Sequence, residues 1–278
     1  DIREDTCTLD PEAVEAAITP RTRAILGVHT YGYPCDVGAL EAIAARRGLR
    51  LLFDAAPAFG VRFKGRSILQ YGDMSMLSFH ATKLFTTAEG GAVATRNADW
   101  DRRIRFLKNF GIADEETVIG PGINGKMSEL QAAFGLLQLE QVGEEIARRG
   151  AVAAVYRERL AGVRGIRLFP EPADATMNHA YFPIRIIAGE YGADRDALNA
   201  ALRQCNIIAR KYYFPLCSRF PCYAELPSAD PGRLPVAERM SAEVLCLPIY
   251  GTLSPDIAAT IADAVASFPD ANETDDQR

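Results

Sequence analysis

Short apolar runs alternate with amphipathic stretches along the first half of the chain. Runs of strand length occupy residues 23–29, 49–53, 74–79 and 91–95. Between them, residues 11–18 and 37–47 place apolar side chains at helical spacing. Asp10 and Asp36 precede these stretches as predicted helix caps, and Gly48 predicts the end of the second helix. This alternation predicts an α/β fold with a mixed, mostly parallel sheet and helices on both of its faces.

The second half of the chain has a different pattern. Residues 127–160 follow a helical period with an apolar stripe, and Gly150 offers a joint within them. The stripe consists of Met127, Leu130, Phe134, Leu137 and Ile146. Further on, the pattern predicts a strand at 182–187 and helices at 194–205, 236–245 and 255–268. We therefore expect a large domain over residues 1–150, a smaller α+β domain over 151–268 and a tail over 269–278.

Composition and charge narrow the classes of function. The 278 residues carry 31 Lys and Arg against 36 Asp and Glu, a net charge of -5, which disfavours nucleic acid as a partner. No apolar run approaches the ~20 residues that span a bilayer, so no membrane segment is expected. The six cysteines are scattered without CxxC or HxxxH spacing. They predict reduced thiols in a cytoplasmic protein and no metal site.

Polar side chains follow two of the predicted strands at the points where those strands end. Asp54 comes directly after the second strand, and Ser78, His80 and Lys83 come at the end of the third. Ligands of open α/β sheets bind at this carboxyl edge. A desolvated Lys83 would be a nucleophilic amine capable of Schiff-base chemistry, whereas an exposed one would be an ordinary loop lysine. Asp54 fits either a ligand contact or a turn cap, so residue types alone leave both positions open.

Three longer segments resemble a known family. They are residues 54–60 (DAAPAFG), 78–93 (SFHATKLFTTAEGGAV) and 122–140 (GINGKMSELQAAFGLLQLE). The last two keep residue type and order over more than ten positions, and the similarity extends from residue 8 to residue 255. They resemble the sugar aminotransferases of the DegT/DnrJ/EryC1/StrS family. The resemblance implies a fold-type I, aspartate-aminotransferase-like architecture and pyridoxal 5'-phosphate as cofactor.

The resemblance also assigns roles to particular residues. Lys83 matches the lysine that holds the cofactor as a Schiff base and then moves the proton. Asp54 matches the carboxylate at the pyridine nitrogen, which keeps the ring protonated and a better electron sink. Ser78 matches a hydroxyl donor to the cofactor phosphate. Asn124 matches an amide that reaches the phosphate from the partner subunit, which implies a homodimer with a shared active site.

Two histidines are less closely tied to the site. His80 lies next to the lysine and is characteristic of a subset of the family. We interpret it as a packing residue near the site, with proton transfer as the alternative. His29 follows the first strand, where its side chain would either line the cleft or pack in the hydrophobic core. We favour the structural role in the core.

Two features depart from the family pattern. Pro57 stands where the family has Gln or His near the cofactor ring, and proline offers no side-chain hydrogen bond. The family's chains also begin earlier, with a helix start that binds the phosphate through backbone N–H groups. No such segment precedes Thr8, so we expect that this sequence lacks the family's N-terminal part.

The resemblance implies a transaminase that moves an amino group from an amino acid, first of all glutamate, to a nucleotide-linked keto sugar. The residues of these motifs most resemble those of family enzymes that aminate C4 of a dTDP-4-keto-6-deoxyhexose. The resulting amino sugars are used in surface glycans such as lipopolysaccharide, or in natural products. Three alternatives remain. The protein could be a transaminase that aminates C3, a related sugar dehydratase, or a catalytically incompetent family member that keeps only the fold and the dimer surface. The dehydratases carry His where this chain has Lys83. No GxGxxG or GxxxxGK[ST] motif supports a simple nucleotide-binding module.

Overall fold

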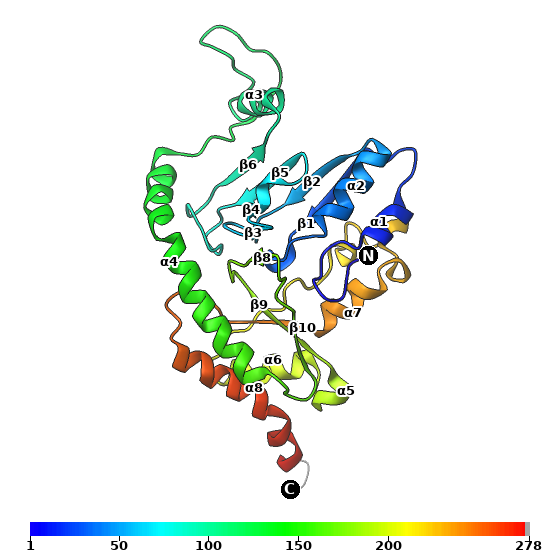
Figure 1. Cartoon of the computed structure of the whole chain (residues 1–278), viewed down its shortest axis with the longest axis vertical. Coiled ribbons are helices and arrows are strands. Elements are labelled where there is room, and N and C mark those ends of the chain that lie inside the picture. Colours follow the sequence, from blue (N-terminus) through cyan, green and yellow to red (C-terminus); the bar gives the residue numbers. More distant parts are fainter. Residues whose placement is uncertain (276–278) are drawn as a thin grey trace.

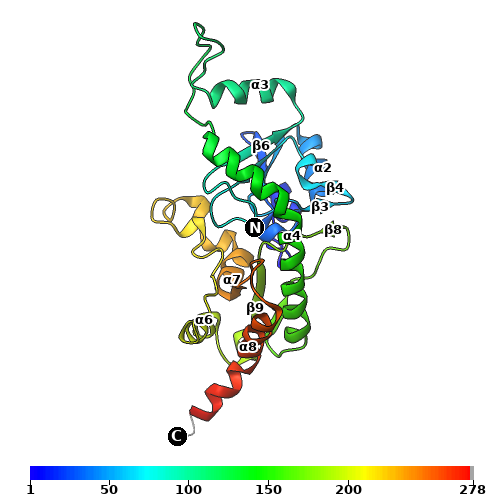
Figure 2. The same cartoon turned by 90° about the vertical axis from the view of Figure 1, so that its left-hand side faces the viewer.

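The computed structural model describes residues 1–275, with side chains described to residue 268. Figure 1 shows a large sheet in the upper half of the molecule and a smaller unit below it. One long helix, α4 (Glu129–Leu160), runs along both. Figure 2 shows α3 (Ala98–Leu107) and the loop after it projecting beyond the sheet. The residues expected as a tail begin inside α8 (Pro255–Asp275), and 276–278 lie outside the described residues.

The large sheet has the order β1-β2-β5-β6. Its strands are β1 (Ala24–Val28), β2 (Arg50–Asp54), β5 (Met74–Ser78) and β6 (Gly91–Thr95). The first three run parallel, and β6 pairs antiparallel with β5. This mixed, mostly parallel α/β sheet confirms the expected fold class.

Two helices precede and follow β1, and both are capped as expected. The Asp10 side chain accepts the Glu12 N–H at the start of α1 (Pro11–Ala17). The Asp36 side chain accepts the Ala39 N–H at the start of α2 (Val37–Arg47), which Gly48 ends in the left-handed region. Local capping chemistry therefore fixes the ends of these helices.

The two faces of the large sheet differ in exposure. Ile25 and Phe53 point to the face on which α2 packs and are buried. The alternate residues point to the other face, where apolar side chains are exposed in this chain: Leu26, Val28, Met76 and Val93. We expected helices on both faces, whereas within residues 1–268 these four side chains remain open to solvent.

Helix α4 contacts both of the main cores. Val142 and Ile146 pack on the core of the large sheet, and Val152 and Tyr156 belong to the core of the smaller unit. The helix continues through Gly150 without the expected joint. Residue 150 thus lies where the contacts of α4 pass from one core to the other, which supports the proposed division of domains there.

The smaller unit is built on an antiparallel sheet of order β10-β9-β7. Its elements are β7 (Ile166–Leu168), β9 (Phe182–Ile186), α5 (Ala188–Tyr191), α6 (Arg195–Gln204), α7 (Pro235–Glu243), β10 (Val244–Leu247) and α8. The helix expected over 236–245 was too long, because Val244 and Leu245 belong to β10 and pair with β9. A third sheet joins β3 (Arg62–Phe63), β4 (Arg66–Ser67) and β8 (Ala175–Thr176) beneath the large one.

Candidate active site

The sheet brings three of the predicted residues to one edge. Val28 pairs with Asp54 and Asp54 pairs with Met76, so β1, β2 and β5 end at nearly the same level. His29, Asp54 and Ser78 therefore stand at the carboxyl ends of adjacent strands. This edge is where parallel sheets bind their ligands.

Asp54 is half-buried and retains an oxygen for a ligand. Its Oδ1 accepts the N–H of Ala56 at 2.8 Å, which is the turn cap considered from the sequence. Among the described residues, no hydrogen bond engages Oδ2. The carboxylate can therefore cap the turn and receive a ligand hydrogen at the same time.

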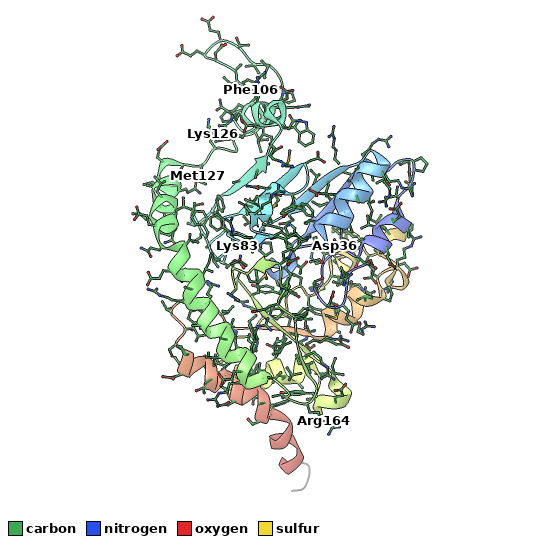
Figure 3. All side chains as sticks on the ribbon, viewed as in Figure 1. Asp36, Lys83, Phe106, Lys126, Met127 and Arg164 are labelled. Carbon is green, nitrogen blue, oxygen red and sulfur yellow. The ribbon has the colours of Figure 1, made fainter. Side chains whose placement is uncertain are left out.

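Lys83 lies at the junction of the large sheet and the smaller unit, as Figure 3 shows. It is half-buried, and its Nζ is 3.5 Å from the hydroxyl of Tyr181. No carboxylate within residues 1–268 forms an ion pair with it, so the amine is not committed elsewhere. A small cavity separates it from the Asp54 loop, lined among others by Ala56, Pro57 and Asn178.

The loop that carries Lys83 is held in place by its own side chains. The Nδ1 of His80 is 2.9 Å from the hydroxyl of Thr82 and accepts the Thr82 N–H at 3.2 Å. The Nε2 of His80 lies 3.6 Å from a carboxylate oxygen of Glu89. The Lys83 N–H in turn donates to the carbonyl of His80. These contacts attach His80 to the lysine loop, but its side chain is 49% exposed, so its expected role as a packing residue stays a prediction.

Three phenylalanines pack the loop that carries Lys83 against the loop that follows Asp54. The rings of Phe59 and Phe85 stack with centroids 4.4 Å apart, and Phe79 meets Phe85 edge-on at 4.8 Å. Phe79 and Phe85 are buried. Aromatic pairs of this geometry add about 0.5–1.5 kcal/mol each beyond their buried area. The relative placement of Asp54 and Lys83 is thus set by a rigid core rather than by flexible loops.

Two tyrosines of the smaller unit complete the surroundings of the lysine. The ring of Tyr181, whose hydroxyl contacts Lys83, lies 6.4 Å from that of Tyr213. Tyr213 is 41% exposed as a residue, but desolvation of its phenol, followed by the proximity of Tyr181, raises the pKa of Tyr213, and Asp54 contributes in the same direction. Tyr213 therefore stays a neutral phenol. Neither tyrosine was identified from the sequence, because both come from segments remote from the motifs.

Asn178 was also missed, and it holds the loop that contains Pro57. Its side-chain amide donates to the carbonyls of Pro57 and Phe59, both at 2.9 Å, and its Oδ1 accepts the N–H of Ala180. The residue is 1% exposed. Pro57 itself is buried, so its carbonyl contributes to the site architecture while its ring contributes no hydrogen bond.

Replacement of Asn178 by alanine should lower the free energy of unfolding by roughly 1–3 kcal/mol. The cost arises because buried carbonyls lose their donors. Chemical denaturation of the wild type and the variant measures it. Asn178→Asp is the size-matched comparison: it cannot donate as a carboxylate and places a buried charge against two carbonyls, so it should lose at least as much. A change within ~0.5 kcal/mol for Asn178→Ala would disprove the clamp.

His29 is fully buried beneath the strand edge. Its ring stacks on Phe53 with centroids 4.6 Å apart, and its Nδ1 accepts the N–H of Cys35 at 3.0 Å. The hydrogen is therefore on Nε2, which has no partner within the described part of the chain. Burial lowers the pKa of His29 to about 3. A residue with no exposed surface cannot line an open cleft, which favours the core role.

The buried His29 should make the protein less stable in acid. An unfolded histidine titrates near 6.5, so below that pH the unfolded chain binds a proton that the folded chain excludes until about pH 3. Stability is complete above about pH 6.5 and declines as the pH falls toward 3. His29→Gln should flatten that decline by up to about 1.4 kcal/mol per pH unit. Denaturant melts across this pH range measure the slope, and equal slopes for both proteins would contradict the assignment.

Asn124 lies apart from the other predicted residues. We name residues 108–128 the arm, because they project beyond the sheet with α3 (Figure 2). The backbone of Asn124 pairs with Asn109 on the arm, and its side chain is exposed. It lines none of the cavities around Lys83. Within one chain, the structure does not bring Asn124 to the lysine.

The residues at the strand edge fit pyridoxal 5'-phosphate. A free, half-buried amine at Lys83 matches the cofactor aldehyde, and the open oxygen of Asp54 matches a ring N–H. Ser78 offers a hydroxyl at the neighbouring strand end, and the small residues Ala55 and Ala58 leave the loop compact. By contrast, residues 1–268 contain no group of three metal-ligating side chains. No described helix is long and apolar enough to cross a membrane.

Comparisons with known proteins identify the same family and the same fold. The model of the DegT/DnrJ/EryC1/StrS aminotransferase family matches residues 1–266. The dTDP-4-amino-4,6-dideoxy-D-glucose transaminase of Escherichia coli is 44% identical over 264 residues, 94% of this chain and 70% of that protein. The dTDP-3-amino-3,4,6-trideoxy-alpha-D-glucose transaminase of Streptomyces venezuelae is 38% identical, over 95% of this chain and 68% of its own length.

Solved structures give the same result. The crystal structure of DesI in the presence of its TDP-sugar product superposes with a TM-score of 0.92. The two sequences are 38% identical, over 100% of this chain and 70% of DesI. The S. venezuelae DesV structure has a TM-score of 0.88 at 36% identity and covers 96% of this chain and 71% of DesV.

Proposed function

Because the chain belongs to the DegT/DnrJ/EryC1/StrS aminotransferase family, we propose that it transfers an amino group from an amino acid to a nucleotide-linked keto sugar. The observation that carries this proposal is the amine of Lys83, which forms no ion pair within residues 1–268, beside the strand edge that bears Asp54. The E. coli relative favours dTDP-4-keto-6-deoxyglucose as acceptor, and glutamate is the proposed donor. The S. venezuelae relative makes a 3-keto sugar the second candidate.

Family enzymes are pyridoxal 5'-phosphate-dependent. When bound, the cofactor supplies the electron sink that lets the proton leave the carbon carrying the amine. Lys83 would hold the cofactor through Nζ. Once the substrate's amine has displaced it, the freed Lys83 amine would take that proton and return it to the aldehyde carbon of the cofactor. Asp54 keeps the ring nitrogen protonated through its free oxygen. Ser78 donates its hydroxyl to the phosphate, and Tyr181 orients the Lys83 amine through its hydroxyl.

The active site is proposed to form between two subunits. Of the expected apolar stripe, Met127 and Ile146 pack on the core of the large sheet, whereas Leu130, Phe134 and Leu137 are exposed. Large apolar side chains are exposed along the arm and the first half of α4 in the single chain. They are Phe110, Ile112, Val118, Ile119, Ile123, Leu130, Phe134, Leu136, Leu137 and Leu139. A surface of this size and composition typically meets a partner. A second copy seated on it would carry the partner's arm, and with it Asn124, to the Lys83 site.

The proposed function also suggests the cellular compartment of the protein and the use of its product. All six cysteines are free thiols, which supports a reducing, cytoplasmic compartment. The aminated sugar would be used in a surface glycan such as lipopolysaccharide, or in a glycosylated natural product. Both uses require an upstream reaction that oxidises a sugar hydroxyl to the ketone.

A direct assay tests the proposed function. The protein is incubated with pyridoxal 5'-phosphate, ¹⁵N-glutamate and dTDP-4-keto-6-deoxyglucose, and with the 3-keto isomer in a parallel reaction. Mass spectrometry should find ¹⁵N in a dTDP-amino sugar, and the acceptor that reacts identifies the ring position. If neither keto sugar acquires the label, a transaminase acting on these sugars is refuted and the hypothesis of a catalytically incompetent family member is favoured.

A further inference from the structure

A third apolar core lies where the start of the chain meets the smaller unit. Its members come from these two parts of the molecule and are all buried: Cys7, Tyr31, Tyr33, Phe169, Met240, Val244 and Cys246. Tyr181, whose hydroxyl is 3.5 Å from the Nζ of Lys83, packs against this junction core. Apolar contacts are not directional, so polar contacts at the rim of the junction core must fix how the two parts sit on each other.

We name residues 1–9 the strap, because they fold back on themselves at the rim of the junction core. The backbone of Ile2 bridges to that of Leu9, which closes the strap into a loop. The side chain of Ile2 packs against the junction core, and Cys7 is part of that core. Figure 1 shows the strap between α1 and α7. The strap is therefore a closed loop that apolar side chains anchor in the junction.

The strap caps helix α7 of the smaller unit. The carboxylate of Asp1 accepts the N–H of Val236 at 2.8 Å and that of Ala237 at 2.9 Å. Leu234, which stands at the usual capping position of α7, forms no side-chain hydrogen bond to the helix. The first N–H groups of a helix have no partner within it and need an acceptor from outside. The start of α7 therefore takes its cap from the strap.

Glu4 ties the strap to both α7 and β9. Its carboxylate accepts from Arg239 of α7 at 2.6 Å and from Arg185 of β9. The side chain of Arg185 is only 15% exposed and also pairs with Glu243 at the end of α7. A guanidinium that has lost most of its water needs such carboxylate partners. The hydrogen bond from Arg185 holds the pKa of Glu4 below its usual range, so Glu4 is ionised at neutral pH.

A short series of contacts leads from the strap to the reacting amine. The strap packs on the junction core, where the ring of Tyr31 lies 6.0 Å from that of Tyr181, and Tyr181 contacts Lys83. From these contacts and the two ion pairs of Glu4, we propose that Glu4 is a positioning residue. By tying β9 and α7 to the strap, it keeps the hydroxyl of Tyr181 in place at the Lys83 amine. The inference rests on the proposed function for the reaction that Lys83 performs.

The test compares Glu4→Gln and Glu4→Asp with the wild type, and with Asp5→Asn as matched control. The side chains of Glu4 and Asp5 are equally exposed, at 49% and 48%, but the ion pair of Asp5 stays within the strap, with Arg3. Amide hydrogen exchange, resolved by peptide mass spectrometry, reports how firmly the strap holds the start of α7. Stopped-flow absorbance of the cofactor-loaded protein follows its reaction with glutamate.

We expect Glu4→Gln to speed exchange at the start of α7 and to lower the maximal rate with glutamate about 3- to 10-fold. The half-saturating concentration should stay within about twofold, because a partner of Lys83 is displaced rather than a contact to the substrate. Glu4→Asp keeps the charge on a shorter side chain and should lie between. Faster exchange without a slower reaction, a slower reaction without faster exchange, or no difference from Asp5→Asn would overturn the positioning role.

Failure of this inference is distinguishable from failure of the proposed function. A wild type that reacts with glutamate at a rate independent of Glu4 refutes the positioning role alone. A wild type that does not react with glutamate refutes the proposed donor, and the reactivity of Lys83 then decides the positioning role. Brief acetylation of the whole chain by acetic anhydride without added cofactor, followed by peptide mapping, measures that reactivity. A change in Glu4→Gln that is absent from Asp5→Asn supports the positioning role, and equal reactivities refute it.

Discussion

Replacement of Lys83 by alanine will abolish amino transfer, with a loss of at least about 10⁴-fold in kcat. The side chain has two roles that no neighbour can take over, since it holds the cofactor and it moves the proton. The hydroxyl of Tyr181, 3.5 Å from Nζ, belongs to a phenol and cannot replace a basic amine. Steady-state formation of the amino sugar measures the loss.

Two variants separate chemistry from structure at this position. Lys83→Arg keeps the positive charge but cannot deprotonate, so it should be as inactive as the alanine variant. Lys64→Ala, at an exposed lysine in the turn between β3 and β4, should retain full activity. Residual activity well above ~0.01% in Lys83→Ala would show that another group moves the proton.

Replacement of Asp54 by asparagine should lower kcat by about 10- to 1000-fold. A carboxylate beside the ring nitrogen raises its pKa by about 1–3 units, and each unit lost reduces the protonated fraction near neutral pH tenfold. Asparagine can still accept the Ala56 N–H that Asp54 binds at 2.8 Å, so the turn is kept. The loss can therefore be assigned to the missing charge.

The pH dependence gives an independent measure of the Asp54 effect. If the carboxylate maintains ring protonation, activity of Asp54→Asn should recover partly as the pH is lowered, whereas the wild type should not gain. The absorbance spectrum of the bound cofactor, recorded across the same pH range, reports ring protonation directly. Equal kcat for the two proteins at neutral pH would contradict the proposed ion pair.

The sequence predicted those elements whose signals are local. Asp10, Asp36 and Gly48 mark helix ends by side-chain and backbone chemistry within a few residues, and the structure confirms them. The helix predicted over 236–245 included Val244 and Leu245, because the apolar residues of the run at 244–247 fit either period. Its strand state depends on pairing with β9, about sixty residues earlier in the chain.

Gly150 illustrates how packing overrides a local preference. Glycine costs a helix about 1 kcal/mol relative to alanine, which suggested a joint. In the structure, α4 packs on two cores, one on each side of this residue, and remains continuous. A Cβ at position 150 would make only an ordinary contact with the ring of His179, at 3.4 Å. Neither contact is visible from residues near 150.

The candidate site was predictable only in part, for a similar reason. Lys83, Asp54 and Ser78 follow strands in continuous motifs, and the sheet places Asp54 and Ser78 at one edge. Tyr181 and Asn178 come from the smaller unit, roughly a hundred residues away, and carry no motif of their own. A signal for them would have required knowledge of how the smaller unit packs on the edge of the sheet.

Borohydride reduction of the cofactor-loaded protein, followed by peptide mass mapping, tests the central claim most directly. The account predicts one phosphopyridoxyl group on the peptide that contains Lys83. It also predicts that prior treatment with glutamate prevents the labelling, because the cofactor then leaves the lysine with the amino group. A label on another lysine, or no label on Lys83 after reduction, would contradict the account.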